Sequence, residues 1–156
     1  MKTIYLAGGC FWGMQKFLDQ FDGVLYTQVG YANGPDRAVT YRDVCDNSGH
    51  AETVRVDYDE QVLPLAELLH FYFLVIDPTA VNRQGGDVGI QYRTGIYYTD
   101  PADGAVAAEA LRGLARRCDR PLAVENLPLQ NFYPAEEYHQ KYLEKHPDGY
   151  CHIHFD

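Results

Sequence analysis

An apolar strand near the N-terminus is followed by a helix after a turn of only a few residues, and this junction constrains the fold most. Residues 3–7 (Thr-Ile-Tyr-Leu-Ala) form the predicted strand. The apolar residues beyond it have the i, i+3, i+4, i+7 spacing of one helix face: Met14, Phe17, Leu18 and Phe21. This spacing predicts a helix over 11–21. Gly8 and Gly9 permit the tight turn between the two elements.

The rest of the sequence alternates strand and helix patterns. We predict strands at 24–31, 52–58, 92–99 and 122–127, and helices at 64–76, 101–117 and 134–145. The first six elements follow the order β-α-β-β-α-β of a split β-α-β, ferredoxin-like core. We therefore expect an α+β fold with a mixed sheet, in a single domain over 1–156, with an irregular C-terminal tail. The long loops 32–51 and 77–91 are expected to be functional, because compact domains rarely carry such loops otherwise.

Composition narrows the class of protein. The formal charge of −9 argues against a nucleic-acid partner, which needs a basic surface, and no apolar run is long enough to cross a membrane. The N-terminus lacks the pattern of a signal peptide, so we expect a cytoplasmic monomer. The four cysteines lie at 10, 45, 118 and 151 without a Cys-x-x-Cys pair, which disfavours a thioredoxin-type or zinc-ribbon site. Stable disulfides are unexpected in a reducing compartment, but a transient catalytic one is possible.

Cys10 lies between the first strand and its helix, in the segment Gly-Gly-Cys-Phe-Trp-Gly. Backbone N–H groups and the helix dipole at this position favour thiolate over thiol, which makes Cys10 a candidate nucleophile. The alternative is a buried structural cysteine. Phe11 and Trp12 could form an apolar pocket for a small methyl-bearing group, or Phe11 could extend the core stripe of the helix.

Three other segments carry candidate chemistry. Glu52 stands at the head of the strand 52–58, where burial would make it a usable acid near neutral pH, although a solvated strand end is the simpler interpretation. Tyr41 and Tyr92 offer phenolic donors, among 13 tyrosines. The tail carries Cys151 followed by His152 and His154, which could be a metal site, a frayed terminus, or a mobile thiol that reaches Cys10.

These segments together resemble the A-class peptide methionine sulfoxide reductase family. The matches run in family order along nearly the whole chain: Gly9-Cys10-Phe11-Trp12-Gly13, Gly30-Tyr31-Ala32-Asn33-Gly34, Tyr41-Arg42-Asp43-Val44-Cys45, Gly49-His50-Ala51-Glu52, Asp77-Pro78-Thr79, Asn82-Arg83-Gln84-Gly85, Asp87-Val88-Gly89-Ile90-Gln91-Tyr92-Arg93, Phe132-Tyr133-Pro134-Ala135-Glu136, Tyr138-His139-Gln140-Lys141-Tyr142-Leu143 and Gly149-Tyr150-Cys151.

The resemblance implies a role for each candidate. Cys10 would attack the sulfoxide sulfur, while Phe11 and Trp12 hold the methyl group. Glu52 would protonate the sulfoxide oxygen. Tyr41 and Tyr92 would donate hydrogen bonds. Asp87 would support the site, and Cys151 would resolve the sulfenic acid.

The resemblance also implies the substrates and the reductant. The substrates would be the S epimer of methionine sulfoxide, free or in oxidised proteins. Thioredoxin, or dithiothreitol in the test tube, would reduce the Cys10–Cys151 disulfide, with no bound cofactor and no metal.

Two alternatives from other classes remain at this point. One is a cysteine hydrolase that uses Cys10 with His50, the only histidine inside a candidate motif. The other is a metal-binding module built on the tail. Some family members carry a second recycling cysteine further along, whereas this sequence ends five residues after Cys151. Cys45 is expected to be structural, and Cys118 matches no motif.

Overall fold

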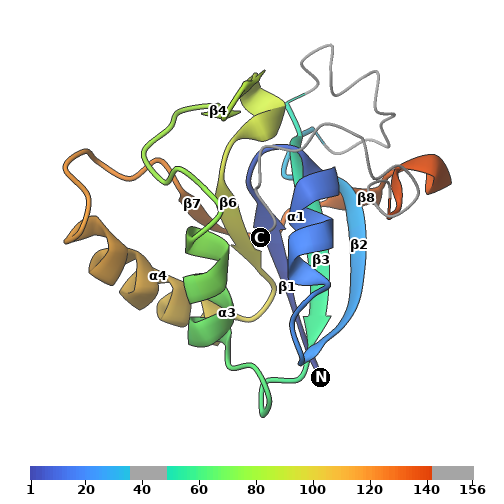
Figure 1. Ribbon diagram of the computed structural model, residues 1–156, viewed down its shortest axis with the longest axis horizontal. Coiled ribbons are helices and arrows are strands. Elements are labelled where there is room, and N and C mark those ends of the chain that lie inside the picture. Colours follow the sequence, from blue (N-terminus) through green and yellow to red (C-terminus); the bar gives the residue numbers. More distant parts are fainter. Residues whose placement is uncertain (36–48, 142–156) are drawn as a thin grey trace.

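The computed structural model describes residues 1–35 and 49–141 of the chain (Figure 1). In chain order the elements are β1 (Lys2–Ala7), α1 (Phe11–Leu18), β2 (Val24–Ala32), β3 (Ala51–Tyr58), α3 (Leu65–Phe73), β4 (Arg83–Gln84), β5 (Asp87–Val88), η1 (Ile90–Tyr92), β6 (Gly95–Tyr98), α4 (Pro101–Ala115), β7 (Glu125–Pro128), β8 (Phe132–Pro134) and η2 (Glu137–His139).

Six strands form one mixed sheet in the order β7-β6-β1-β3-β2-β8. Neighbouring strands are antiparallel throughout this sheet except for β6 and β7, which pair in parallel. The parallel strands β1 and β2 are separated by β3, which is the arrangement of a split β-α-β core. The predicted α+β, ferredoxin-like core with a mixed sheet is confirmed.

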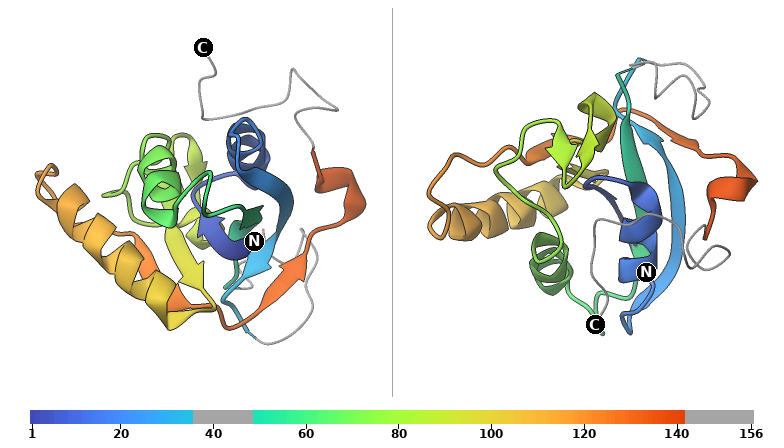
Figure 2. Two further views of the ribbon diagram at one scale, coloured as in Figure 1. Left: turned by 90° about the horizontal axis from the view of Figure 1, so that it is seen from below. Right: turned by 45° about the horizontal axis from the view of Figure 1, so that its top comes forward.

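The helices α1, α3 and α4 cover one face of this sheet (Figures 1 and 2). Side chains alternate along β1, so Ile4 and Leu6 are fully buried in the core under the helices, while Tyr5 and Ala7 belong to a smaller cluster on the other face. Phe132, the first residue of β8, packs against this smaller cluster. The first strand therefore contributes to both faces, and its C-terminal end is held firmly in place.

The predicted helix over 134–145 is not present in the part of this segment that the structure describes. Residues 132–134 form the edge strand β8 against β2, and between there and residue 141, where the described part ends, the short 3₁₀ turn η2 is the only helical element. The Gln140 side chain accepts the N–H of Val29 over 3.0 Å and donates to the carbonyl of Val29 over 3.0 Å. This amide extends the strand pairing along β2, and that contact outweighs the local helix pattern.

The strand predicted at 92–99 begins later, at Gly95. Tyr92 ends η1, and its carbonyl accepts the N–H of Gly9 over 3.2 Å, so the backbone there bonds the turn after β1. The loop predicted over 77–91 contains the small hairpin of β4 and β5. Two residues per strand are too few to produce an alternating pattern in the sequence.

Candidate active site

Cys10 occupies the N-cap position of α1, directly after the turn from β1. Gly9 makes this turn with φ of 76°, a conformation that glycine adopts at little cost. A Cβ on Gly8 would lie 2.7 Å from the side chain of Ile76, so glycine is needed there for close packing. Cys10 is buried, with 6% of its surface exposed. The glycines thus place the thiol at the floor of a tightly packed site.

Glu52 lies at the same end of the sheet because β1 and β3 are antiparallel. Ala7, the last residue of β1, pairs with Thr53, so Glu52 is level with the turn that precedes Cys10. Glu52 also shares the helix-covered face of β3 with Val54 and is only 1% exposed. The interpretation of Glu52 as a solvated strand end is therefore wrong.

The electrostatics of Glu52 suit a general acid. Its Oε1 accepts the backbone N–H of Phe11 over 3.2 Å, while its buried Oε2 has no hydrogen-bond partner among the described residues. Burial raises the pKa of Glu52 to about 8, assisted by the charge of Asp87 and opposed by the Phe11 N–H. Glu52 is therefore a protonated, neutral acid at pH 7.

The thiol of Cys10 is also protonated in the substrate-free site. Burial raises the pKa of Cys10 most, the charge that Glu52 carries once it ionises above its own pKa raises it further, and the backbone N–H groups of Trp12 and Gly13 oppose this only in part. The expectation that the start of a helix makes Cys10 a thiolate is thus wrong for this pocket. Desolvation exceeds the stabilisation by two N–H groups.

Asp87 of β5 and Tyr92 at the end of η1 lie next to Cys10 and the turn before it. The backbone N–H of Cys10 donates toward the Asp87 carboxylate and lowers its pKa, but burial raises that pKa more, to a net value above the ordinary one. Tyr92 is half-buried and adjoins the turn through the bond from Gly9. The structure thus brings Asp87 and the Tyr92 backbone close to Cys10, whereas the role of Tyr92 as a phenolic donor stays a prediction.

Phe11 and Trp12 differ in their surroundings. Phe11 is 1% exposed and its ring packs 5.7 Å from that of Tyr31, so it belongs to the core as well as to the site. Trp12 is only partly buried, and its indole stacks on His139 with ring centroids 5.6 Å apart. These two aromatic side chains follow Cys10 directly in the chain, and their role as a pocket for a methyl group stays a prediction.

His139 and Glu136 are site residues to which the sequence analysis assigned no role. The indole Nε1–H of Trp12 donates to Nδ1 of His139 over 3.0 Å, and Nε2 of His139 faces Oε2 of Glu136 at 3.4 Å. Tyr31 donates to the same Glu136 oxygen over 3.4 Å. Burial lowers the pKa of His139, so its neutral form can accept the indole proton. Both residues lie inside stretches that carry the family resemblance, which was the available signal.

Several predicted residues lie outside the described part of the chain: Tyr41, Cys45, Cys151, His152 and His154. Cys118 is half-buried near the end of α4, and His50 is buried at the start of β3. Within residues 1–35 and 49–141, no group of three His, Cys, Asp or Glu side chains could hold a metal ion. No helix in those same ranges is long and apolar enough to cross a membrane.

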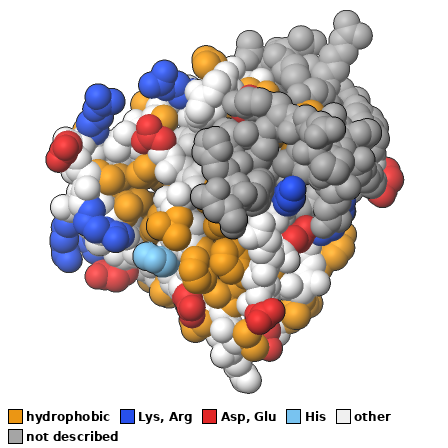
Figure 3. Space-filling model, in the orientation of Figure 1, with side chains coloured by type: hydrophobic (Ala, Val, Ile, Leu, Met, Phe, Trp, Pro, Cys, Tyr) orange, Lys and Arg blue, Asp and Glu red, His pale blue; other side chains and the backbone are white. Residues whose placement is uncertain are grey.

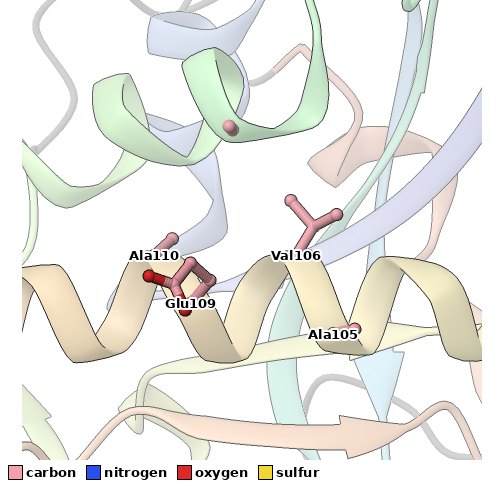
Figure 4. Close-up of a pocket in the computed structure, with 5 residues that line it drawn as sticks. Ala105, Val106, Glu109 and Ala110 are labelled. Carbon is pink, nitrogen blue, oxygen red and sulfur yellow. The ribbon is translucent and has the colours of Figure 1, made fainter.

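A cavity between α3 and α4 lies away from this site (Figure 4). It is lined by Ala66 of α3 and by four residues of α4: Ala105, Val106, Glu109 and Ala110. Hydrophobic side chains gather over these helices on the face shown in Figure 3. The cavity contains no residue that the sequence analysis selected, so the candidate chemistry remains at Cys10.

Comparisons with known proteins agree on one family. The family model described as peptide methionine sulfoxide reductase matches residues 2–156. The peptide methionine sulfoxide reductase MsrA of Lachnoclostridium phytofermentans is 59% identical over 153 residues, which cover 97% of this chain and 92% of that protein.

Solved structures give the same result. Mxr1 from Saccharomyces cerevisiae in reduced form has a TM-score of 0.91 and 38% identity, over 96% of this chain and 88% of that one. Mxr1 in complex with Trx2 has a TM-score of 0.65 and 28% identity, over 90% of this chain and 84% of that one.

Proposed function

The chain belongs to the peptide methionine sulfoxide reductase family, and from this premise we propose how its own residues carry out the reaction. The protein is an oxidoreductase that reduces methionine sulfoxide to methionine with electrons from thiols, in the repair of oxidised proteins, and thioredoxin recycles it. Cys10 is the nucleophile and Glu52 is the acid. The observation that carries this assignment is a buried carboxyl with a raised pKa, one backbone hydrogen bond away from the residue that follows the thiol.

The first step balances without an external proton. The sulfur of Cys10 attacks the sulfoxide sulfur, and Glu52 gives its proton to the oxygen. The resulting hydroxyl group then moves to the sulfur of Cys10, as the bond between the two sulfurs and the S–O bond of the substrate break. The thiol proton of Cys10 replaces the proton on Glu52. The products are methionine and a sulfenic acid on Cys10, and the enzyme thiol has lost the two electrons that the sulfoxide gained.

A dry site suits this exchange. A neutral Glu52 can donate its proton where charge develops on the oxygen, and its burial away from bulk solvent strengthens the interaction. Cys10 loses its thiol proton only when the sulfoxide is bound, because Glu52 can take that proton only after it has given its own to the sulfoxide oxygen. The raised pKa of Cys10 in the substrate-free site then protects the thiol from indiscriminate oxidation.

The wall formed by Phe11 and Trp12 holds the methyl group of the substrate, and Asp87 supports the turn that presents Cys10. Tyr92 and Tyr41 donate hydrogen bonds to the sulfoxide oxygen. Methyl group and oxygen must then lie on different walls, which fits only one configuration at sulfur. We infer that this is the S epimer.

The second half of the cycle regenerates the thiol. Cys151 attacks the sulfenic acid on Cys10, water leaves, and a Cys10–Cys151 disulfide forms. A thioredoxin dithiol reduces this disulfide, a step supported by the thioredoxin complex of the yeast relative. The family membership favours this cycle over a cysteine hydrolase or a metal-binding tail.

The whole chain, 1–156, is proposed to act as one catalytic domain. We place it in the cytoplasm, where thioredoxin is kept reduced and a disulfide at Cys10 would be transient. Both assignments follow from the chemistry of the cycle.

The test is an assay of purified protein with dithiothreitol and each epimer of N-acetyl-methionine sulfoxide amide. Methionine should form from the S epimer alone. Equal turnover of both epimers would contradict the pocket, and no turnover of either would contradict the function.

A further inference from the structure

The hairpin of β4 and β5 has two different faces. Gln84 pairs with Asp87, and Arg83 pairs with Val88. Because side chains alternate along a strand, Gln84 and Asp87 share the inner face and Arg83 and Val88 the outer one. Burial agrees with this, since Gln84 is 2% exposed and Val88 is 72% exposed.

The outer face belongs to an apolar rim, which consists of Val81, Val88 and Ile90. Val81 is 71% exposed and Ile90 37% exposed. The N–H of Gly89 donates to the carbonyl of Asn82 over 2.9 Å, which keeps the two sides of the hairpin together next to Val81 and Ile90. Single exposed apolar residues are common, but three within ten residues beside a nucleophile are not explained by packing.

The rim is continuous with the active site. Asp87, the neighbour of Val88 in the chain, receives the backbone N–H of Cys10, and η1, which contains Ile90, ends at the carbonyl that binds Gly9. Consecutive Cα atoms are about 3.8 Å apart, so Val88 lies one residue along the chain from Asp87, on the opposite face of the hairpin.

The hairpin is also held in place before any substrate arrives. The Gln84 amide accepts the N–H of Asp77 over 2.7 Å and donates to the carbonyl of Asp77 over 2.9 Å. This pair of bonds fixes the hairpin to the segment after α3. A surface that is already ordered loses little entropy when a ligand binds to it.

We propose that the rim binds the apolar side chains that flank methionine sulfoxide in an oxidised, locally unfolded polypeptide. This proposal rests on the function proposed above. Methionine is mostly a core residue, and its oxidation disrupts the core around it. The residues next to a damaged methionine are therefore often apolar and newly exposed. With the sulfoxide beside Cys10, neighbours one or two positions away lie about 3.3–7 Å further along the chain, and the hairpin and η1 that carry Val88 and Ile90 adjoin Cys10 through Asp87 and Tyr92.

A protein reductant is the other candidate occupant. It needs to reach only the disulfide sulfur, whereas a peptide must cross the edge of the site while its sulfoxide is bound. The peptide therefore makes the longer contact with the rim, and contact with the reductant becomes one outcome of the test.

The test compares three S-sulfoxide substrates with dithiothreitol as reductant: Leu-flanked and Ser-flanked blocked tripeptides, and N-acetyl-methionine sulfoxide amide. The unsubstituted protein should prefer the Leu-flanked peptide by about 3- to 10-fold in kcat/KM, through KM, as expected for partial burial of apolar side chains. Val88→Ser and Ile90→Ser should remove most of this preference and leave the reaction of the blocked amino acid unchanged.

Val62→Ser is the matched control. Val62 is 56% exposed in the turn between β3 and α3, at the opposite end of the molecule from the hairpin (Figure 1). This variant should keep the full preference.

Four results would overturn the proposal. They are the absence of any preference in the unsubstituted protein, an unchanged preference in both rim variants, an equal loss for the blocked amino acid, and, when thioredoxin replaces dithiothreitol, a change in the rim variants that is confined to the KM for thioredoxin. Failure of the unsubstituted protein to reduce the blocked amino acid would contradict the proposed function itself.

Discussion

The backbone N–H of Phe11 donates to Oε1 of Glu52 over 3.2 Å, so the acid at the head of β3 is tied to the first residue of the helix that carries the thiol. The bond connects two segments that are 41 positions apart in the chain. It lowers the pKa of Glu52 less than burial raises it. Glu52 therefore stays protonated while it is held in a single place.

Glu52→Gln should slow the reductive step by about 10²- to 10⁴-fold, because an amide cannot donate a proton as a general acid. The measurement is single-turnover formation of methionine from the S-sulfoxide without reductant. The exposed acid Glu60 supplies the control, since Glu60→Gln should leave the rate unchanged. A near-normal rate in Glu52→Gln would make Glu52 a bystander.

The same variant should change how stability depends on pH. The pKa of Glu52 is about 8 in the folded protein and has its ordinary value of 4.5 when the chain unfolds, so between these values the folded state binds more protons. Its contribution to stability is thus present below about pH 4.5 and is lost as pH rises through 8, at roughly 1 kcal/mol per pH unit. Glu52→Gln removes this group and should reduce the loss.

Urea unfolding at pH 5.5 and pH 8 measures this difference. The unsubstituted protein should lose more unfolding free energy between the two pH values than Glu52→Gln. Equal losses in both proteins would show that Glu52 titrates normally in the fold.

Trp12 is the only tryptophan in the chain, so its fluorescence reports on the wall that holds the methyl group. His139→Phe removes the acceptor of the indole N–H. In His139→Gln, the side-chain carbonyl of the new residue can still accept this hydrogen bond. We expect His139→Phe to shift the emission and to raise the KM for sulfoxide about fivefold, because one hydrogen bond contributes about 1 kcal/mol. His139→Gln should be affected less. Identical effects in both variants would mean that His139 acts only as packing.

Cys151→Ser should separate the two halves of the cycle. Cys10 alone removes the first oxygen, so one methionine per enzyme should still form. Thioredoxin-supported turnover should collapse, because no disulfide with Cys10 can form. Cys118→Ser is the control and should turn over normally. Full thioredoxin-dependent activity in Cys151→Ser would show that another thiol resolves the sulfenic acid.

The sequence predicts this fold well where patterns are long. The alternation in β3 and the periodicity of α4 locate both elements to within two residues, and the junction at Cys10 follows from its glycines. The segment after β8 could not be predicted, because a side-chain amide, Gln140, replaces the backbone pairing that a helix would need. Such contacts depend on residues distant in sequence.

The sequence predicts which residues form the site, but it does not predict their protonation states. Sequence position places Cys10 at a helix start, which favours thiolate, but only the packing of β3 beneath α1 reveals how strongly burial opposes it. The same packing makes Glu52 an acid. The bond from Trp12 to His139 spans 127 positions and follows no local pattern.

The most direct test of the central claim is one turnover without reductant. The purified protein is mixed with one equivalent of the S-sulfoxide of N-acetyl-methionine amide, and methionine yield and cysteine oxidation are measured by mass spectrometry of peptides. We predict one methionine product per enzyme, with Cys10 oxidised in every turnover and found in a disulfide with Cys151. Methionine formed while Cys10 stays reduced, or formed equally well by Cys10→Ser, would contradict Cys10 as the nucleophile.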